Sequence, residues 1–278
     1  MISDIVISIF NQAPTSIDKI EKGLTNQNFK IIVANKPYVL RVPYKDSEHI
    51  VDRHLEQKAL ALVKDADIDV TTVYFDAKTG IKVTEYVDGL IGFNEFGDFD
   101  KFLRVGKLMR KLHDLKQTIG HEFDPLDTYQ RYRKHVSKPL ISHQNAQPYL
   151  DFIHINRTVS TMCHNDWVPD NIGFHPTRDY LLDYEYAGDN DPMFDVTSFL
   201  SENNITNPIH RDQFLMAYFD HQYPPQLHKT LLFWEAFHHI LWCCWAQMMF
   251  EQRKKAIYST IALDKKRSFE IIDRQLYR

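Results

Sequence analysis

The chain of 278 residues has 44% hydrophobic and 25% charged residues, a balance typical of a globular protein and unlike that of a disordered or fibrous chain. Lys and Arg number 33 against 37 Asp and Glu, a formal net charge of −4, so no excess of positive charge indicates nucleic-acid binding. The three cysteines match neither a disulfide framework nor a zinc site, and the first ten residues lack the basic start of a secretory signal. A cytoplasmic protein is therefore expected.

Glycine is scarce, with only nine residues in the chain. Neither the dinucleotide fingerprint G-x-G-x-x-G nor the P-loop pattern G-x-x-x-x-G-K-[ST] can be written anywhere in the sequence. A nucleotide would therefore have to be held by another kind of turn.

Residues 231–250 are apolar over the length of a bilayer span. Four polar side chains interrupt this stretch, and such groups are costly in lipid: Glu235, His238, His239 and Gln247. The segment is expected to be a buried helix rather than a membrane span.

Residues 1–87 are predicted to form a strand-rich unit with one helix. Alternating residues at 29–33 and 38–42, with a turn at 35–37, predict an antiparallel hairpin. A helix capped by Ser47 is expected next, because apolar residues then recur at helical spacing: Val51, Leu55, Ala59 and Leu62. Residues 70–76 and 81–87, joined by a turn that ends at Gly80, predict a second hairpin.

Residues 88–278 are predicted to be mostly helical. An amphipathic helix is expected over 98–116, followed by a polar stretch and a second helix that ends near Met162. Residues 172–174 and 180–182 predict a short hairpin, and the chain from Pro192 onward is helical apart from breaks at Pro208 and at 224–225. The prediction is an α+β fold with a small antiparallel β-sheet lobe (1–87), a larger helical lobe (88–278) and a cleft between them.

The segment 163–171, CHNDWVPDN, carries the most specific motif. The catalytic loop of protein kinases has the pattern H-R-D-x-x-x-x-N, and His164, Asp166 and Asn171 reproduce it with Asn165 in place of the arginine. The predicted hairpin returns Asp183 beside Asn171, where a carboxylate and an amide oxygen suit Mg²⁺. The alternative is a polar loop whose side chains bond only to their own backbone.

The sequences HNDWVPDNIGF and LLDYEYAGDNDPMFD resemble those of the choline/ethanolamine kinases, within the aminoglycoside phosphotransferase and protein-kinase-like superfamily. The resemblance is strongest to the bacterial choline kinases and extends over EKGLTNQNF, YVLRVP, LMRKLH and the late tryptophan-rich helix. It implies a two-lobed, protein-kinase-like fold and ATP and Mg²⁺ as cofactors. The absence of an A-P-E motif favours a small-molecule kinase over a protein kinase.

The resemblance implies a nucleotide site in the first lobe. A turn over the phosphates would come from Gly23, Leu24, Thr25 and Asn26, and the cation at the phosphates would be Arg41, whose guanidinium can bind phosphate in a bidentate manner. Glu56 would hold Arg41 in place, although an ion pair with Arg53, three residues earlier, explains it equally well. The backbone around Glu85 and Val87 would meet the adenine base.

The resemblance also implies roles around the catalytic loop. Asp166 would be the catalytic base, and Asn171 and Asp183 would hold Mg²⁺. Asp195 would bond the backbone of the catalytic loop from below, and His113 would be structural.

For the acceptor, the resemblance points to an aromatic wall around a quaternary ammonium. Trp242 and Trp245 share one face of a helix, and Tyr258 would complete the cage. Glu185 and Glu202 would add a negative field near the cation. Core packing is the alternative explanation for such an aromatic stripe.

The function expected from the resemblance is ATP-dependent phosphorylation of choline to phosphocholine and ADP. A thiamine, ethanolamine or aminoglycoside kinase on the same scaffold is an alternative. A catalytically inactive pseudokinase is another, although Asp166, Asn171 and Asp183 are all present. The oligomeric state does not follow from the sequence.

Overall fold

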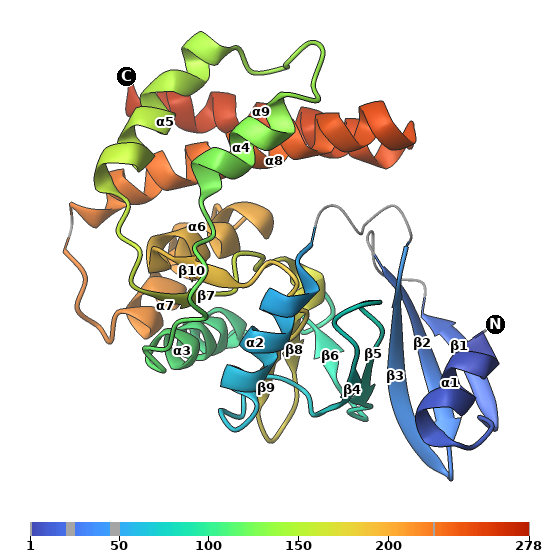
Figure 1. The fold of residues 1–278 in the computed structure, drawn as a ribbon. Coiled ribbons are helices and arrows are strands. Elements are labelled where there is room, and N and C mark those ends of the chain that lie inside the picture. The colour runs from blue at the N-terminus through green and yellow to red at the C-terminus, as the bar shows by residue number, and fades with distance from the viewer. Residues whose placement is uncertain (1, 21–25, 45–50, 225, 278) are drawn as a thin grey trace.

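The computed structural model describes residues 2–20, 26–44, 51–224 and 226–277. An antiparallel sheet dominates the first part of the chain (Figure 1), with the strand order β1-β2-β3-β5-β4. Its strands are β1 (Ser16–Ile20), β2 (Asn26–Val33), β3 (Lys36–Pro43), β4 (Thr72–Phe75) and β5 (Lys82–Glu85). Both predicted hairpins are present, β2 with β3 and β4 with β5.

A helix that the sequence analysis did not predict, α1 (Ile2–Phe10), precedes the sheet. Its buried Val6 packs with Phe29, Ile31 and Leu40, which come from β2 and β3. This first part of the chain therefore has a second helix and a small apolar core of its own.

The predicted helix of the first unit is α2 (Arg53–Val63), which begins later than expected. Its cap is Asp52, whose side chain accepts hydrogen bonds from the backbone N–H groups of His54 and Leu55. Ser47, the predicted cap, lies outside the described residues. The buried side of α2, including Leu60, belongs to the same apolar cluster as Val105 of the later helical part, so α2 is anchored to both parts of the molecule.

The later part of the chain is mostly helical, as predicted. Its long helices are α3 (Lys101–His113), α4 (Pro125–Arg133), α5 (His143–Asn156), α6 (Pro192–Glu202), α7 (Pro208–Tyr218), α8 (Leu227–Arg253) and α9 (Ala256–Leu276). The helix expected to end near Met162 is α5, which ends earlier because residues 161–163 form a strand. The polar stretch expected after the first helix of this part contains α4, capped by Asp124.

Short strands flank the segment 163–171, which is called the catalytic loop below because of its predicted role. β6 (Ile91–Gly92), β8 (Ile172–Phe174) and β9 (Asp179–Leu181) form one small sheet, and β7 (Thr161–Cys163) pairs with β10 (Gly188–Asn190). The predicted hairpin is the antiparallel pair β8 and β9. The 3-10 turn η2 (Pro169–Asn171) closes the loop between β7 and β8.

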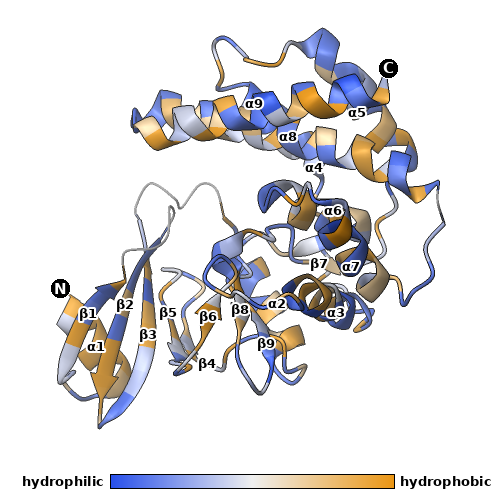
Figure 2. Ribbon diagram, turned by 180° about the vertical axis from the view of Figure 1, so that it is seen from behind, coloured by the Kyte–Doolittle hydropathy of each residue, from blue (hydrophilic) through white to orange (hydrophobic). Residues whose placement is uncertain are grey.

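The helices form two groups (Figure 1): α4, α5, α8 and α9 lie together, and α3, α6 and α7 lie nearer the small strands. Hydrophobic residues are frequent where α3, α6 and α7 meet (Figure 2). Residues 231–250 lie inside α8 and are largely buried, as expected. Among the described residues, no helix combines the length and the apolar character needed to cross a bilayer. The lobe boundary at residues 87 and 88 stays a prediction.

Candidate active site

The catalytic loop is held from below by Asp195, near the start of α6. The Asp195 carboxylate accepts hydrogen bonds from the backbone N–H groups of His164 at 2.8 Å and Asn165 at 2.7 Å. His113 of α3 lies 3.1 Å from the same carboxylate. Burial alone would raise the pKa of Asp195, but its contacts with His113, together with those of His164 and Trp167, outweigh burial and lower it. The loop contact that the resemblance implied for Asp195 is therefore present, and His113 supports it.

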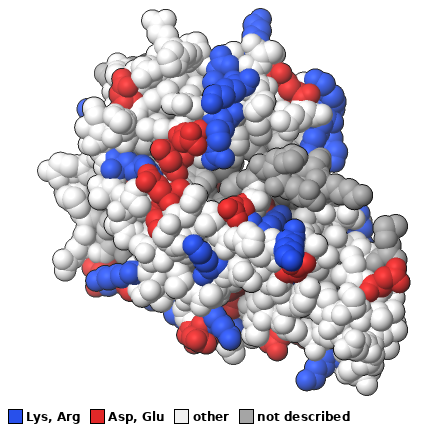
Figure 3. All heavy atoms as spheres, viewed as in Figure 1, with Lys and Arg blue, Asp and Glu red and all other residues white. Residues whose placement is uncertain are grey.

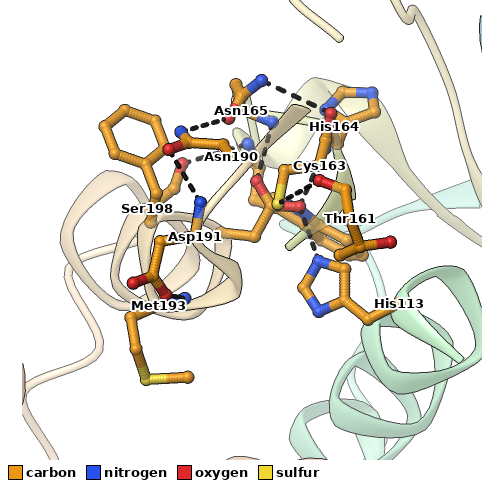
Figure 4. A network of polar contacts seen from close by, with 12 residues as sticks. His113, Thr161, Cys163, His164, Asn165, Asn190, Asp191, Met193 and Ser198 are labelled. Atoms are coloured by element: carbon orange, nitrogen blue, oxygen red, sulfur yellow. Dashed lines mark hydrogen bonds and ion pairs between the residues drawn. The ribbon is translucent and has the colours of Figure 1, made fainter. Parts of the chain in front are cut away.

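Asn165 replaces the arginine of the kinase pattern, and its backbone explains why an asparagine fits. Its φ is 65°, a left-handed conformation that Asn tolerates better than most side chains. Its amide group donates to the Tyr186 carbonyl at 2.9 Å, and its side-chain oxygen accepts from Asn190 at 2.9 Å (Figure 4). Asn165 thus fixes the shape of the loop.

Asp166 and Asn171 lie at opposite ends of the loop and contact each other. The Asn171 amide nitrogen donates to Asp166 Oδ2 at 3.0 Å and to the Asp166 carbonyl at 2.9 Å. Burial, with added repulsion from Glu185, Glu202 and Asp183, raises the pKa of Asp166 well above its usual range. A carboxylate in such a place binds a proton readily.

Asp183 directly follows the predicted hairpin. The N–H of Leu182 donates to the Asn171 carbonyl at 2.8 Å, which places the next residue, Asp183, beside the catalytic loop. Asn171 and Asp183 line the same cavity. An amide oxygen and a carboxylate are the donors that a hard cation such as Mg²⁺ prefers, so this residue pair fits the predicted metal site.

Arg41 on β3 forms ion pairs with two carboxylates. Its guanidinium lies 2.6 Å from Asp183 Oδ1 and 2.7 Å from Glu56 Oε1. Burial disfavours the charged form of Arg41 and would lower its pKa, but the negative charges of Asp183 and Glu56 outweigh burial and raise it. Glu56 is also bonded to Arg53 at 2.9 Å, so both pairings considered from the sequence occur together.

A cavity of about 380 Å³, called here the smaller cavity, lies between the five-stranded sheet and the catalytic loop. Arg41, Glu85 and Val87 line it together with Asn171 and Asp183. The residues predicted to bind phosphate and adenine therefore line the same cavity as the predicted metal ligands. Gly23, Leu24 and Thr25 lie outside the described residues.

Two residues of the smaller cavity were missed as candidates. Lys82 on β5 lies directly opposite Arg41 on β3, and its Nζ is 3.8 Å from Asp69 Oδ2. Burial raises the pKa of Asp69 to about 6. The pairing of a lysine with a distant aspartate depends on the sheet register, which the sequence alone did not reveal.

A cavity of about 1240 Å³, called the larger cavity, is lined by Glu185, which follows Asp183 by two positions in the chain. Figure 3 shows acidic and basic side chains gathered around the hollow near the middle of this face. Arg53 of α2, Tyr132 of α4, Glu185, Tyr186 and Met248 of α8 are among its lining residues. The two cavities adjoin along the segment that contains Asp183 and Glu185.

Glu185 lies at this junction rather than among the tryptophans. Its Oε2 accepts from Asn26 at 3.1 Å and pairs with Arg53 at 3.1 Å. Burial, reinforced by Asp183, raises the pKa of Glu185. Asn26, the described residue of the predicted phosphate turn, therefore contacts a candidate acceptor-site carboxylate.

Four aromatic side chains form a continuous row beside the larger cavity. The ring centroids of Tyr186 and Trp242 are 6.2 Å apart, those of Trp242 and Trp245 6.1 Å, and those of Trp245 and Tyr258 5.7 Å, all edge to face. Trp242, Trp245 and Tyr258 are buried in the same cluster, whereas Tyr186 reaches the cavity wall. Tyr186 and Tyr132 were missed as candidates.

Glu202, the second predicted acceptor-site carboxylate, has a cationic partner. Lys265 of α9 lies 2.6 Å from Glu202 Oε1, and both side chains are mostly buried. Glu202 is nevertheless close enough to Asp166 to raise its pKa. Its negative field therefore reaches the catalytic loop, partly offset by the lysine.

The comparison with protein families assigns the chain to a family. The model of the phosphotransferase enzyme family (APH) matches residues 16–231, most of the chain. The chain belongs to this family.

Individual relatives and solved structures also resemble this chain. Protein LicA of Haemophilus influenzae is 24% identical over 250 residues, covering 81% of this chain and 90% of LicA. The crystal structure of choline kinase LicA from Streptococcus pneumoniae aligns with a TM-score of 0.81 and 23% identity, covering 99% and 98% of the two chains. A choline/ethanolamine kinase family protein from Mesorhizobium loti aligns with a TM-score of 0.82 and 20% identity, covering 98% and 95%. The predicted protein-kinase-like fold is thereby confirmed.

Proposed function

We propose that this phosphotransferase transfers the γ-phosphoryl group of ATP to the hydroxyl group of choline, with Mg²⁺ as the metal. The observation that carries the choline assignment is the row from Tyr186 through Trp242 and Trp245 to Tyr258, which begins three residues after Asp183. A trimethylammonium has no N–H group to donate, so aromatic faces and carboxylates are the groups that can recognise it.

The smaller cavity would hold the nucleotide. The backbone near Glu85 and Val87 lines one end of it, and Arg41 lies at the other, beside Asp183. Asn171 and Asp183 would hold Mg²⁺, which would neutralise charge on the phosphate oxygens. In this arrangement Arg41 would exchange its contact with Asp183 for one with phosphate.

Asp166 would receive the proton of the acceptor hydroxyl. The hydroxyl oxygen forms a bond to the γ-phosphorus, the bond from that phosphorus to the bridging oxygen of ADP breaks, and the proton passes to the carboxylate. Asn171 holds the carboxylate in position through its 3.0 Å hydrogen bond. The raised pKa of Asp166 matches the task of a base.

The larger cavity would admit choline, with its cationic end toward the aromatic row. Tyr132 and Tyr186 line the cavity wall, and the carboxylates of Glu185 and Glu202 give the region negative charge. Trp242, Trp245 and Tyr258 would complete the cage from behind Tyr186.

An assay of ATP consumption with a graded series of alcohols tests this proposal. The series is ethanolamine, its monomethyl and dimethyl derivatives, and choline, with thiamine and an aminoglycoside as alternative acceptors. We expect kcat/KM to rise with each added methyl group, because cation–π recognition favours the larger, less hydrated cation. A maximum at ethanolamine, thiamine or the aminoglycoside contradicts the choline assignment. No consumption with any acceptor supports a pseudokinase.

A further inference from the structure

Arg53, the first residue of α2, is a mostly buried cation that lines the larger cavity. Only 10% of its side chain is exposed, and one guanidinium nitrogen, Nη1, contacts both Glu56 Oε2 at 2.9 Å and Glu185 Oε2 at 3.1 Å. It thus connects the helix that positions Arg41 with the segment that follows Asp183.

Arg41 and Arg53 both form an ion pair with Glu56, and each of them lines a different cavity. Arg41 contacts Asp183 and lines the smaller cavity, whereas Arg53 contacts Glu185 and lines the larger cavity. The two arginines therefore lie on successive parts of the path between the nucleotide and the acceptor.

The guanidinium of Arg53 has unused donor capacity. Its Nη2 atom is buried and has no hydrogen-bond partner among the described residues. A buried N–H group without a partner is costly, so such a group is best explained by an anion that it meets during function.

The neighbouring turn leaves space for this guanidinium. Gly80, with φ +71°, lies against it, and a Cβ atom there would be 2.7 Å from Arg53 Nε and 2.8 Å from Pro43 Cγ. A side chain at position 80 would displace Arg53 from its place beside Glu185.

We propose that Arg53 is a second phosphate-binding cation, which contacts the transferred phosphoryl group on the acceptor side while Arg41 holds the phosphates of the departing ADP. This role rests on the proposed phosphoryl transfer. Arg53 pairs with Glu185 through Nη1 in the structure and would donate charged hydrogen bonds from its free Nη2 to the γ-phosphoryl oxygens. As the phosphoryl group moves toward the acceptor, negative charge moves from the side of Arg41 to the side of Arg53.

Nucleotide binding without any acceptor tests this role separately from the choline assignment. The affinities of Mg·ADP and of Mg·AMP-PNP, a non-hydrolysable ATP analogue, are measured by calorimetry for the parent and for Arg53→Gln. We expect the variant to bind AMP-PNP about tenfold more weakly or worse, the usual range for a charged hydrogen bond, and ADP within about twofold of the parent. Arg53→Lys, which keeps the charge but cannot contact the two carboxylates and a phosphate from separate nitrogens, should lose part of the AMP-PNP affinity.

Lys58→Gln is the matched control, because Lys58 is an exposed cation on the same helix. It should leave both affinities unchanged. Equal losses of ADP and AMP-PNP affinity in Arg53→Gln would show that Arg53 only braces Glu56 and Arg41, and unchanged AMP-PNP affinity would show that it meets no γ-phosphate. If Arg53→Gln does not fold, the ADP and AMP-PNP affinities of Arg53→Lys are compared with those of the parent instead. Failure of the parent to bind either nucleotide would instead contradict the proposed function.

Discussion

Arg41 on β3 and Asp183 after β9 form an ion pair at 2.6 Å, although 142 positions separate them in the chain. This contact joins the five-stranded sheet to the catalytic-loop region across the smaller cavity. In the proposed roles, Arg41 would bind phosphate and Asp183 would bind the metal, so a nucleotide that carries both would separate the two side chains. Activity would then need both residues, Arg41 to bind phosphate and Asp183 to bind the metal.

The first prediction concerns the metal. Asp183→Asn should abolish phosphoryl transfer even at saturating ATP, because the carboxylate that would place the metal is lost. Asn171→Ala should be partly rescued by higher Mg²⁺, because one weaker ligand is lost. Initial rates across a Mg²⁺ titration measure both effects. Equal activity with excess EDTA and with Mg²⁺ would contradict the metal assignment.

The second prediction concerns Asp166. Asp166→Asn should lower kcat by roughly 10²–10⁴-fold, the usual contribution of a positioned base. The amide can keep a contact with Asn171, which lies 3.0 Å away, so the loop should keep its shape. Nucleotide affinity serves as the internal control and should be unchanged. Near-normal turnover of the purified variant would remove Asp166 from the reaction.

The third prediction concerns pH. Because burial and the nearby carboxylates raise the pKa of Asp166, its basic form is lost at a higher pH than for an ordinary aspartate. Activity should therefore fall as the pH drops through this raised pKa. Glu202→Gln removes one of the negative charges that raise it, so the acidic limb of the kcat profile should move to lower pH. An acidic limb at the same pH in parent and variant would show that another group controls it.

The strands and the loop of this site can be predicted from the sequence, because patterns among neighbouring residues determine them. The alternation in 29–42 and the spacing of His164, Asp166 and Asn171 predict β2, β3 and the catalytic loop. α4 also had a local signal, Asp124 before Pro125, that was overlooked in a polar stretch. The contacts of Glu185 and Arg53 could not be predicted, because they depend on how α2 packs against a segment 132 positions away.

The fourth prediction concerns the aromatic row. Trp242→Phe and Trp245→Phe should raise the KM for choline and leave the KM for ATP near that of the parent. A whole cation–π contact contributes roughly 0.5–2 kcal/mol, about a two- to thirtyfold change in KM, and phenylalanine keeps part of it, so the rise should stay within that range. Trp234→Phe is the control, because Trp234 is a buried residue of the same helix that packs on Phe194. Parallel loss of ATP and choline use would instead indicate core packing.

The fifth prediction concerns the packing of α3 against α7. Side chains of these two helices are connected to the catalytic loop through Asp195. Gly106 lies where these helices approach most closely: a Cβ atom would be 2.5 Å from the Phe214 carbonyl oxygen and 2.8 Å from Ala217 Cβ. Both contacts belong to α7, so the clash can be relieved only by moving a helix. Overpacking of this kind costs about 1–3 kcal/mol, more than the roughly 1 kcal/mol that alanine gains over glycine in a helix.

Gly106→Ala should therefore lower the free energy of unfolding, as measured by urea denaturation. It should also lower kcat, because the Tyr218 hydroxyl of α7 lies 2.8 Å from His113, which in turn contacts Asp195 beneath the catalytic loop. Gly97→Ala is the control, since a Cβ atom at position 97 meets no other atom within 4 Å. If Gly106→Ala destabilises the protein but leaves kcat unchanged, α7 only packs against α3, and the position of the catalytic loop does not depend on the contact between Tyr218 and His113.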